Sequence, residues 1–185
     1  MRHSWRAIAA ALAALTLLLV PSVASADQGG SVLKVKMNDD CDPATWGATV
    51  CLKNGGTTPQ ELVAAVQKDG GDGAWWINPR EHTIDKGDTI EVSDNGGLPH
   101  TFTEVKQYGG ACFNTLAIFP GLPAFNDILG IQPVAECGNL GAVFASFVAP
   151  GSPTVTISNL SVGTHLFQCV FHPWMHSKIV VRDHA

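Results

Sequence analysis

The sequence contains few basic side chains. Lys and Arg together number 11 against 16 Asp and Glu, and no two of the basic residues are adjacent. Binding to nucleic acid depends on clustered Lys and Arg that neutralise phosphates, so this composition argues against nucleic acid as a partner. The formal net charge of −5 fits a soluble protein, and it is compatible with a partner that has a basic surface.

Long apolar runs are also lacking, apart from one near the N-terminus. Residues 7–20 form an apolar run that follows Arg2 and Arg6 and precedes an Ala-Ser-Ala motif ending at position 26. A basic start, an apolar segment and a small-x-small ending are typical of an export signal peptide. The run is short for a membrane span, which needs roughly 20 residues. We therefore predict a signal peptide over residues 1–26.

Residues 27–185 then have the length of a single domain, and they contain no further candidate membrane span. Loss of two arginines with the signal peptide would take the formal net charge from −5 to −7. No cysteine follows position 26 directly, which argues against a lipid anchor. We expect an exported protein, either periplasmic or extracellular.

The five cysteines are an odd number, and all lie after position 26. Exported proteins use disulfides, so a leftover thiol needs an explanation. Pairing sequence neighbours gives Cys41–Cys51 and Cys112–Cys137 and leaves Cys169 alone. The sequence does not fix this connectivity, and other pairings remain open.

Short alternating segments separated by Gly, Pro, Asn and Asp make up most of the chain, and they predict an all-β sandwich. The candidate strands cover residues 31–37, 74–79, 80–84, 89–94, 100–105, 154–160, 164–169 and 178–182. One helix is predicted at TTPQELVAAVQKDG, where Thr58 can cap, Pro59 suits the first turn, Glu61 completes a capping box and Gly70 ends the helix. Residues 106–153 are the least regular and form a disulfide-containing insertion.

The stretch FQCVFHPWMHSKIVV places Cys169, His172 and Met175 at two-residue intervals between two predicted strands. In so tight a loop the three side chains can converge on one point. Thiolate and thioether are soft ligands, and copper suits a His₂Cys set with a weak axial Met. His100 follows a Gly-Gly-Leu-Pro turn and can supply the second imidazole. Zinc rarely takes a thioether and would want another Cys, His or carboxylate.

These residues resemble the cupredoxins, small blue-copper electron carriers that include plastocyanin, pseudoazurin and amicyanin. The likeness is in GDTIEVSDNGGLPHTF and GTHLFQCVFHPWMHSKIVV, and the Cys-x₂-His-x₂-Met spacing is most similar to amicyanin. The resemblance implies a Greek-key β-sandwich with one copper ion at one end. Carried over by position, the ligands are His100, Cys169, His172 and Met175.

The sequence departs from the family at several points. Where relatives often have an Asn that braces the Cys loop, Thr101 stands here, and its hydroxyl can do part of that work. The resemblance also implies that His172 exposes an edge through an apolar patch, to which Phe171, Pro173 and Trp174 could contribute. The LAIFPGLPAF run of the insertion is a candidate lid or partner surface. An equal alternative is that the run only enlarges the fold and has no role in function.

The leading hypothesis is a type 1 copper protein that transfers single electrons to a redox protein partner as a monomer. The alternative is a copper-binding module for storage, delivery or sensing. We do not expect an enzyme, because copper oxidases and nitrite reductases need further histidine clusters such as His-x-His, which are absent from the sequence. A structural zinc site is the remaining option.

Overall fold

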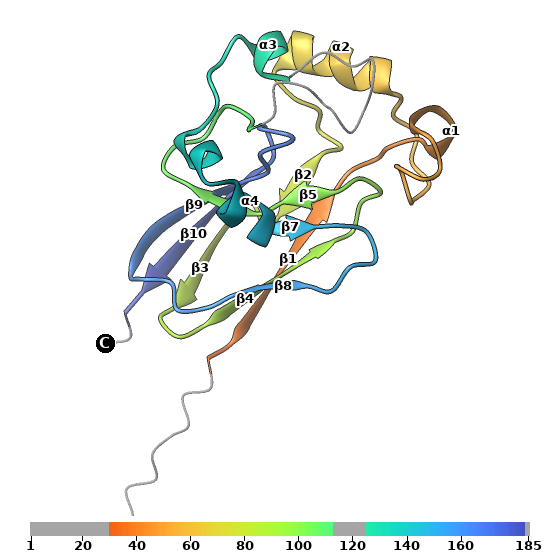
Figure 1. The fold of residues 1–185 in the computed structure, drawn as a ribbon. Coiled ribbons are helices and arrows are strands. Elements are labelled where there is room, and N and C mark those ends of the chain that lie inside the picture. Colours follow the sequence, from red (N-terminus) through yellow and green to blue (C-terminus); the bar gives the residue numbers. More distant parts are fainter. Residues whose placement is uncertain (1–29, 113–124, 184–185) are drawn as a thin grey trace, which may run out of the picture.

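The computed structural model describes residues 30–112 and 125–183, which form a β-sandwich with the helices α1, α2 and α3 at one end (Figure 1). The predicted signal peptide lies outside the described residues, so it and the domain boundary that follows it stay predictions. Within the described ranges, no helix is long and apolar enough to span a membrane.

The first sheet has four strands in the order β2-β1-β4-β8. Strand β1 lies parallel to β4, and the other two pairings of this sheet are antiparallel. The strands are β1 (Val32–Asn38), β2 (Trp76–Asn78), β4 (Thr89–Asp94) and β8 (Val155–Ile157). Their inward side chains, such as Val35, Met37, Ile90 and Val92, have no exposed surface.

The second sheet has the order β3-β10-β9-β6, with β3 parallel to β10. Its strands are β3 (Glu81–Asp85), β6 (Thr103–Val105), β9 (Gly163–Gln168) and β10 (His176–Arg182). A short ladder of β5 (His100–Thr101) and β7 (Phe147–Val148) forms a third, two-stranded sheet. Side chains two apart on a strand share a face, and His165, Phe167 and Cys169 are all buried.

The strand order confirms the predicted Greek-key β-sandwich. Neighbours within each sheet are mostly not consecutive in sequence, so the connections cross between the sheets. One such crossing lies between β2 and β3 at Pro79, which has no N–H to continue a strand ladder. Side chains of both sheets form one apolar core, in which the Phe102 and Phe167 rings stack with centroids 4.3 Å apart.

The predicted helix is confirmed as α2 (Pro59–Asp69). Thr58 and Glu61 form the capping box, and Gly70 ends the helix with a φ of 73°. This φ belongs to the left-handed region, which glycine adopts at the lowest cost. Leu62 and Val66 form the buried face of the helix.

The structure adds short helical elements that the sequence did not predict. They are α1 (Pro43–Trp46), α3 (Phe125–Leu129), α4 (Leu140–Ala145) and a 3₁₀ helix, η1 (Ala135–Gly138). Three of the four lie in the insertion of residues 106–153. Most of the LAIFPGLPAF run lies outside the described residues, so its role as a lid remains a prediction.

Both predicted disulfides are present, Cys41–Cys51 and Cys112–Cys137, and Cys169 is a free, buried thiol. The first disulfide closes the loop around α1, and the second lies in the insertion. Backbone N–H of Cys112 donates to the carbonyl of Val170, so the insertion is tied directly to the loop that follows β9.

Candidate metal centre

The loop between β9 and β10 carries three of the four predicted ligands. Cys169 follows the last residue of β9, and Met175 precedes the first residue of β10. The backbone N–H of Cys169 donates to the carbonyl of Met175 at 2.9 Å, and the N–H of Met175 donates to the carbonyl of His172 at 2.9 Å. These bonds fold the chain back on itself, so residues three apart in sequence lie on one side of a tight turn.

His100 reaches the same place from a different part of the chain. It begins β5 after the Gly-Gly-Leu-Pro turn, and its imidazole has no exposed surface. The Nδ1 atom of His100 lies 3.7 Å from Sγ of Cys169 and 3.1 Å from Nδ1 of His172. The third side of this triangle, from Sγ of Cys169 to Nδ1 of His172, is 3.5 Å.

The triangle has the dimensions of a metal-binding set. A point equidistant from the three atoms lies about 2.0 Å from each, and Zn–N and Zn–S bonds in proteins are about 2.0–2.3 Å long. The three atoms are therefore spaced closely enough to hold one ion together. Two imidazoles and a thiol are also the donor types expected for such a site.

Met175 is the fourth predicted ligand. Its side chain is fully buried and belongs to the apolar core, and its backbone is bonded to the other two residues of the loop. The chain thus brings His100, Cys169, His172 and Met175 to one buried end of the sandwich. Their role as ligands remains a proposal.

The electrostatics of the cluster favour an ionised thiol. Burial opposes the thiolate, but the charge of His172 and a hydrogen bond from His100 outweigh it and hold the pKa of Cys169 well below its usual value. Burial likewise opposes a cationic His100, yet Asp39 and Cys169 raise the pKa of this imidazole. A thiolate is the form of cysteine that binds metals, so the site presents its sulfur ready for coordination.

The expected role of Thr101 is confirmed. Its Oγ1 accepts a hydrogen bond of 3.0 Å from the backbone N–H of Val170, directly after Cys169. The hydroxyl of Thr103 donates to the same oxygen at 3.1 Å and also contacts the hydroxyl of Ser146 at 2.7 Å. The strand that carries His100 and the loop that carries Cys169 are therefore joined by a buried side-chain hydrogen bond.

The implied exposure of His172 is wrong. Its imidazole is only 1% exposed, and Phe171 and Pro173 are buried as well. The end of α2 packs against Trp174: a Cβ built on Gly71 would lie 2.6 Å from Cγ of this indole. The chain just after α2 therefore packs against the indole whose ring lies 5.6 Å from that of His172.

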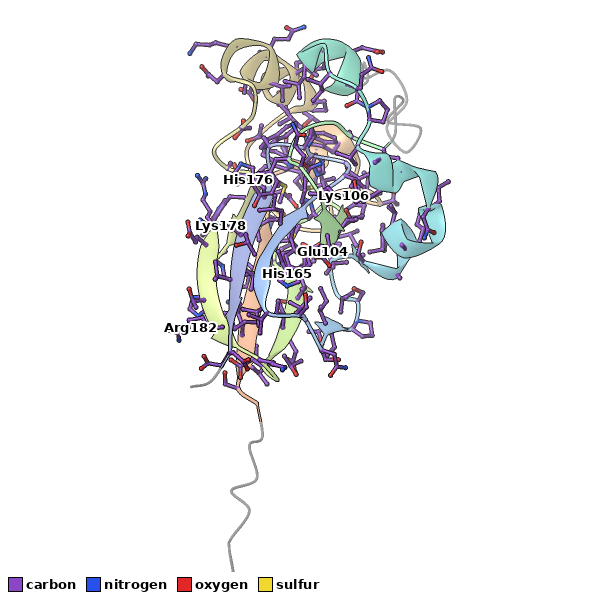
Figure 2. All side chains as sticks on the ribbon, turned by 90° about the vertical axis from the view of Figure 1, so that its left-hand side faces the viewer. Glu104, Lys106, His165, His176, Lys178 and Arg182 are labelled. Carbon is purple, nitrogen blue, oxygen red and sulfur yellow. A yellow bond between two sulfur atoms is a disulfide. The ribbon has the colours of Figure 1, made fainter. Side chains whose placement is uncertain are left out.

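Two further histidines, His165 and His176, lie outside the cluster. His165 is packed, with Nδ1 2.7 Å from the carboxylate of Glu104 and Nε2 2.8 Å from the carbonyl of Ser161. Figure 2 shows this pair on the neighbouring strands β6 and β9. His176 is exposed at the start of β10 and stacks on Tyr108 with ring centroids 4.4 Å apart.

No protein-family model and no curated protein sequence matches the chain. Among solved structures, a purple cupredoxin from Nitrosopumilus maritimus is 13% identical with a TM-score of 0.40, covering 81% of this chain and 99% of that one. A plastocyanin from the fern Dryopteris crassirhizoma is 14% identical with a TM-score of 0.39, covering 80% and 99%. An amicyanin from Paracoccus versutus is 16% identical with a TM-score of 0.34, covering 57% and 72%.

The strand order of this chain agrees with the resemblance seen in its sequence. Two four-stranded sheets form a Greek-key sandwich, and a buried His/Cys/His cluster lies at one end between the starts of β5 and β10. The fold is cupredoxin-like. The case for a metal centre in this cupredoxin-like chain rests on the geometry of its own side chains.

Sequence reasoning missed two carboxylates next to the cluster. Asp39 follows β1, and its Oδ2 lies 2.9 Å from Nε2 of His100. Asp94 ends β4, and burial raises its pKa to about 7. Together with His100 they form a second group of close polar atoms. The Asn-Asp-Asp run at positions 38–40 reads as an ordinary turn, and nothing local in it indicates that one carboxylate is buried.

Proposed function

We propose that this chain is an exported type 1 copper protein that transfers single electrons. The proposed ligands are His100, Cys169, His172 and Met175. The observation that supports this most is the compact triangle of one sulfur and two Nδ1 atoms, 3.1–3.7 Å on a side and fully shielded from solvent. When bound, copper would supply one-electron chemistry by alternating between Cu(I) and Cu(II).

The donor set favours copper over zinc. A structural zinc site closes with four Cys or His ligands, or with a carboxylate. Here the fourth candidate in the ligand loop is the thioether of Met175, whose side chain is fully buried. A His₂Cys plane with a weak axial thioether is the typical blue-copper set.

The rigidity of the site favours an electron carrier over a module for storage, delivery or sensing. The backbone bonds within the ligand loop and the bond from Val170 to Thr101 hold the side chains in place without an ion. A site that changes shape little between two charge states has a small barrier to electron transfer, whereas release of an ion needs access to solvent. Two disulfides fit an oxidising compartment, which supports export.

Aromatic rings offer a route between the cluster and a redox protein partner. His172 contacts Trp174 with ring centroids 5.6 Å apart, and it contacts Phe171 at 6.5 Å. Phe171 in turn meets Phe147 at 6.3 Å, and Phe147 is 37% exposed. We propose that electrons leave along these rings rather than through an exposed imidazole edge.

The test of the function uses residues 27–185, refolded without metal and titrated with Cu(II). We expect an intense visible band and a narrow copper hyperfine splitting at one ion per chain. Cys169→Ser should abolish both, whereas His176→Gln, a change at an exposed histidine of the same region, should keep both. A wild-type complex without visible colour would contradict the proposal.

Two further measurements separate carrier from delivery module and test the ring route. Exchange of bound copper with a chelator should take hours or longer for a carrier, and exchange within seconds would favour delivery. Phe147→Leu should slow electron self-exchange without changing the reduction potential. The control is Phe144→Leu, the same change at another exposed ring, for which we expect an unchanged rate.

A further inference from the structure

The side chain of Asp39 is completely buried although it is ionisable and belongs to no strand or helix. It accepts hydrogen bonds from four donors. Oδ1 faces the backbone N–H of Cys41 at 3.2 Å, both oxygens face the N–H of Gly97 at 2.9–3.0 Å, and Oδ2 faces the N–H of Leu98 at 3.0 Å and Nε2 of His100 at 2.9 Å.

This set of partners requires an acceptor at both oxygens. Three partners are backbone amides, which can only donate, so a side chain with a donor in either position would be left facing another donor. A carboxylate satisfies all of them, and its negative charge strengthens each bond. The position is therefore specific for Asp over Asn, which has the same shape.

The turn before His100 is shaped around this carboxylate. A Cβ on Gly96 would collide with Oδ2 of Asp39, and a Cβ on Gly97 would lie 2.6 Å from Sγ of Cys41 in the neighbouring disulfide. The two glycines of the Gly-Gly-Leu-Pro turn thus let the backbone approach Asp39 closely. The turn, the disulfide and the carboxylate form one packed unit beneath the imidazole.

Asp39 also decides which ring nitrogen of His100 faces the cluster. Because a carboxylate only accepts, Nε2 must carry the proton of that bond. The Nδ1 atom is then the nitrogen that faces Cys169 and His172. Carboxylate partners of this kind fix the tautomer of a metal-binding histidine and increase its basicity.

We propose that Asp39 is a positioning residue that presents Nδ1 of His100 to the metal and lowers the reduction potential of the site. This inference rests on the proposed copper function. Its physical basis is that a buried negative charge, bonded directly to a ligand, stabilises the more highly charged Cu(II) form more than Cu(I). The carboxylate should therefore strengthen the binding of both copper ions, and the binding of Cu(II) more than that of Cu(I).

The experiment compares wild type, Asp39→Asn and the matched control Asp40→Asn. Asp40 is the adjacent residue, is exposed, and accepts from Gly56 and Thr57 at a distance from the cluster, so its variant removes the same charge in the same segment. Affinities for Cu(I) and Cu(II) and the reduction potential are measured for all three. We expect Asp39→Asn to weaken Cu(II) binding about 10- to 100-fold.

The loss of Cu(I) affinity in Asp39→Asn should be about tenfold smaller than the loss of Cu(II) affinity, which raises the potential by about 59 mV. Asp40→Asn should leave the affinities and the potential unchanged. Equal losses for both ions, or an unchanged potential in a blue Asp39→Asn protein, would overturn the proposal while leaving the copper function intact.

A second readout needs neither copper nor a variant, and it holds if Asp39→Asn fails to fold. In metal-free wild type labelled with ¹⁵N, the ring of His100 should carry a proton on Nε2 that exchanges slowly with water. A ring protonated only on Nδ1, or an Nε2 proton that exchanges as fast as that of exposed His176, would overturn the assignment.

Discussion

The hydroxyl of Thr101 offers the sharpest test of how the two halves of the site are held together. In Thr101→Val the side chain keeps its shape but loses the oxygen that accepts from the backbone N–H of Val170. Both residues have no exposed surface, so water cannot replace the lost acceptor. The variant therefore removes the acceptor of two hydrogen bonds, from Val170 and Thr103, without opening a cavity.

The size of the effect follows from which groups are left unsatisfied. The N–H of Val170 becomes a buried donor without an acceptor, which costs about 1–3 kcal/mol. Thr103 also loses a contact, but its hydroxyl keeps the bond of 2.7 Å to Ser146 and adds little. We expect the metal-free protein to lose about 2 kcal/mol of unfolding free energy in urea.

Amide hydrogen exchange locates the cause of that loss. In Thr101→Val the N–H of Val170 should exchange much faster than in wild type, because its acceptor is gone. Thr101→Ser keeps the hydroxyl and should preserve slow exchange at Val170, although it loses a buried methyl group. Thr83→Val, the same change at an exposed position of β3, controls for the substitution itself.

Three results would refute the reasoning about Thr101. One is a stability of Thr101→Val within about 0.5 kcal/mol of wild type, the usual range for a surface change. Another is unaltered exchange at Val170. The third is equally fast exchange at Val170 in Thr101→Ser and Thr101→Val, which would assign the effect to packing.

Two further predictions concern packing and pH. Gly97→Ala places a methyl group 2.6 Å from Sγ of Cys41 and should cost about 1–3 kcal/mol of unfolding free energy in urea. In the control Gly73→Ala the new methyl group meets no atom within 4 Å, so this variant should be nearly neutral. Equal losses of stability in the two variants would contradict the packing argument. Burial opposes a charged His165, but Ser161 and Glu104 outweigh it and raise its pKa. The stabilisation by this imidazolium is thus complete below the unfolded value near 6.5 and disappears as pH rises through the higher folded value. Unfolding measured from pH 5 to 9 should show Glu104→Gln less stable than wild type at low pH, with the difference shrinking at high pH; a difference independent of pH would contradict the ion pair.

The local parts of the fold and site were predictable from the sequence. The capping box of Thr58 and Glu61 needs only four residues of sequence, and the Cys-x₂-His-x₂-Met spacing needs seven. A period of two over residues 165–169 puts Phe167 and Cys169 on one face whatever lies in the other sheet. His100 was found because a Pro-His pair after a glycine turn is part of a recognisable motif.

The contacts that the sequence did not reveal join segments far apart in the chain. Asp39 lies 61 residues before His100, and its burial depends on how β1 and β4 align. The packing of Gly71 against Trp174, the ring next to His172, depends on where the chain after α2 lies, which helical periodicity does not specify. In both cases local pattern predicts the element but not its neighbour.

The glycines of the turn before His100 take part both in a local sequence pattern and in a long-range contact. In the sequence, Gly96 and Gly97 indicate only a tight turn. In the structure they are the positions where a side chain would displace Asp39 and the Cys41–Cys51 disulfide. A glycine pair that indicates only a turn in the sequence is therefore also required by a contact with residues far away in the chain. Asp39, which precedes the first histidine of the cluster by 61 positions, is bonded to its imidazole, so changes near the end of β1 should affect the proposed metal site as changes in the ligand loop do.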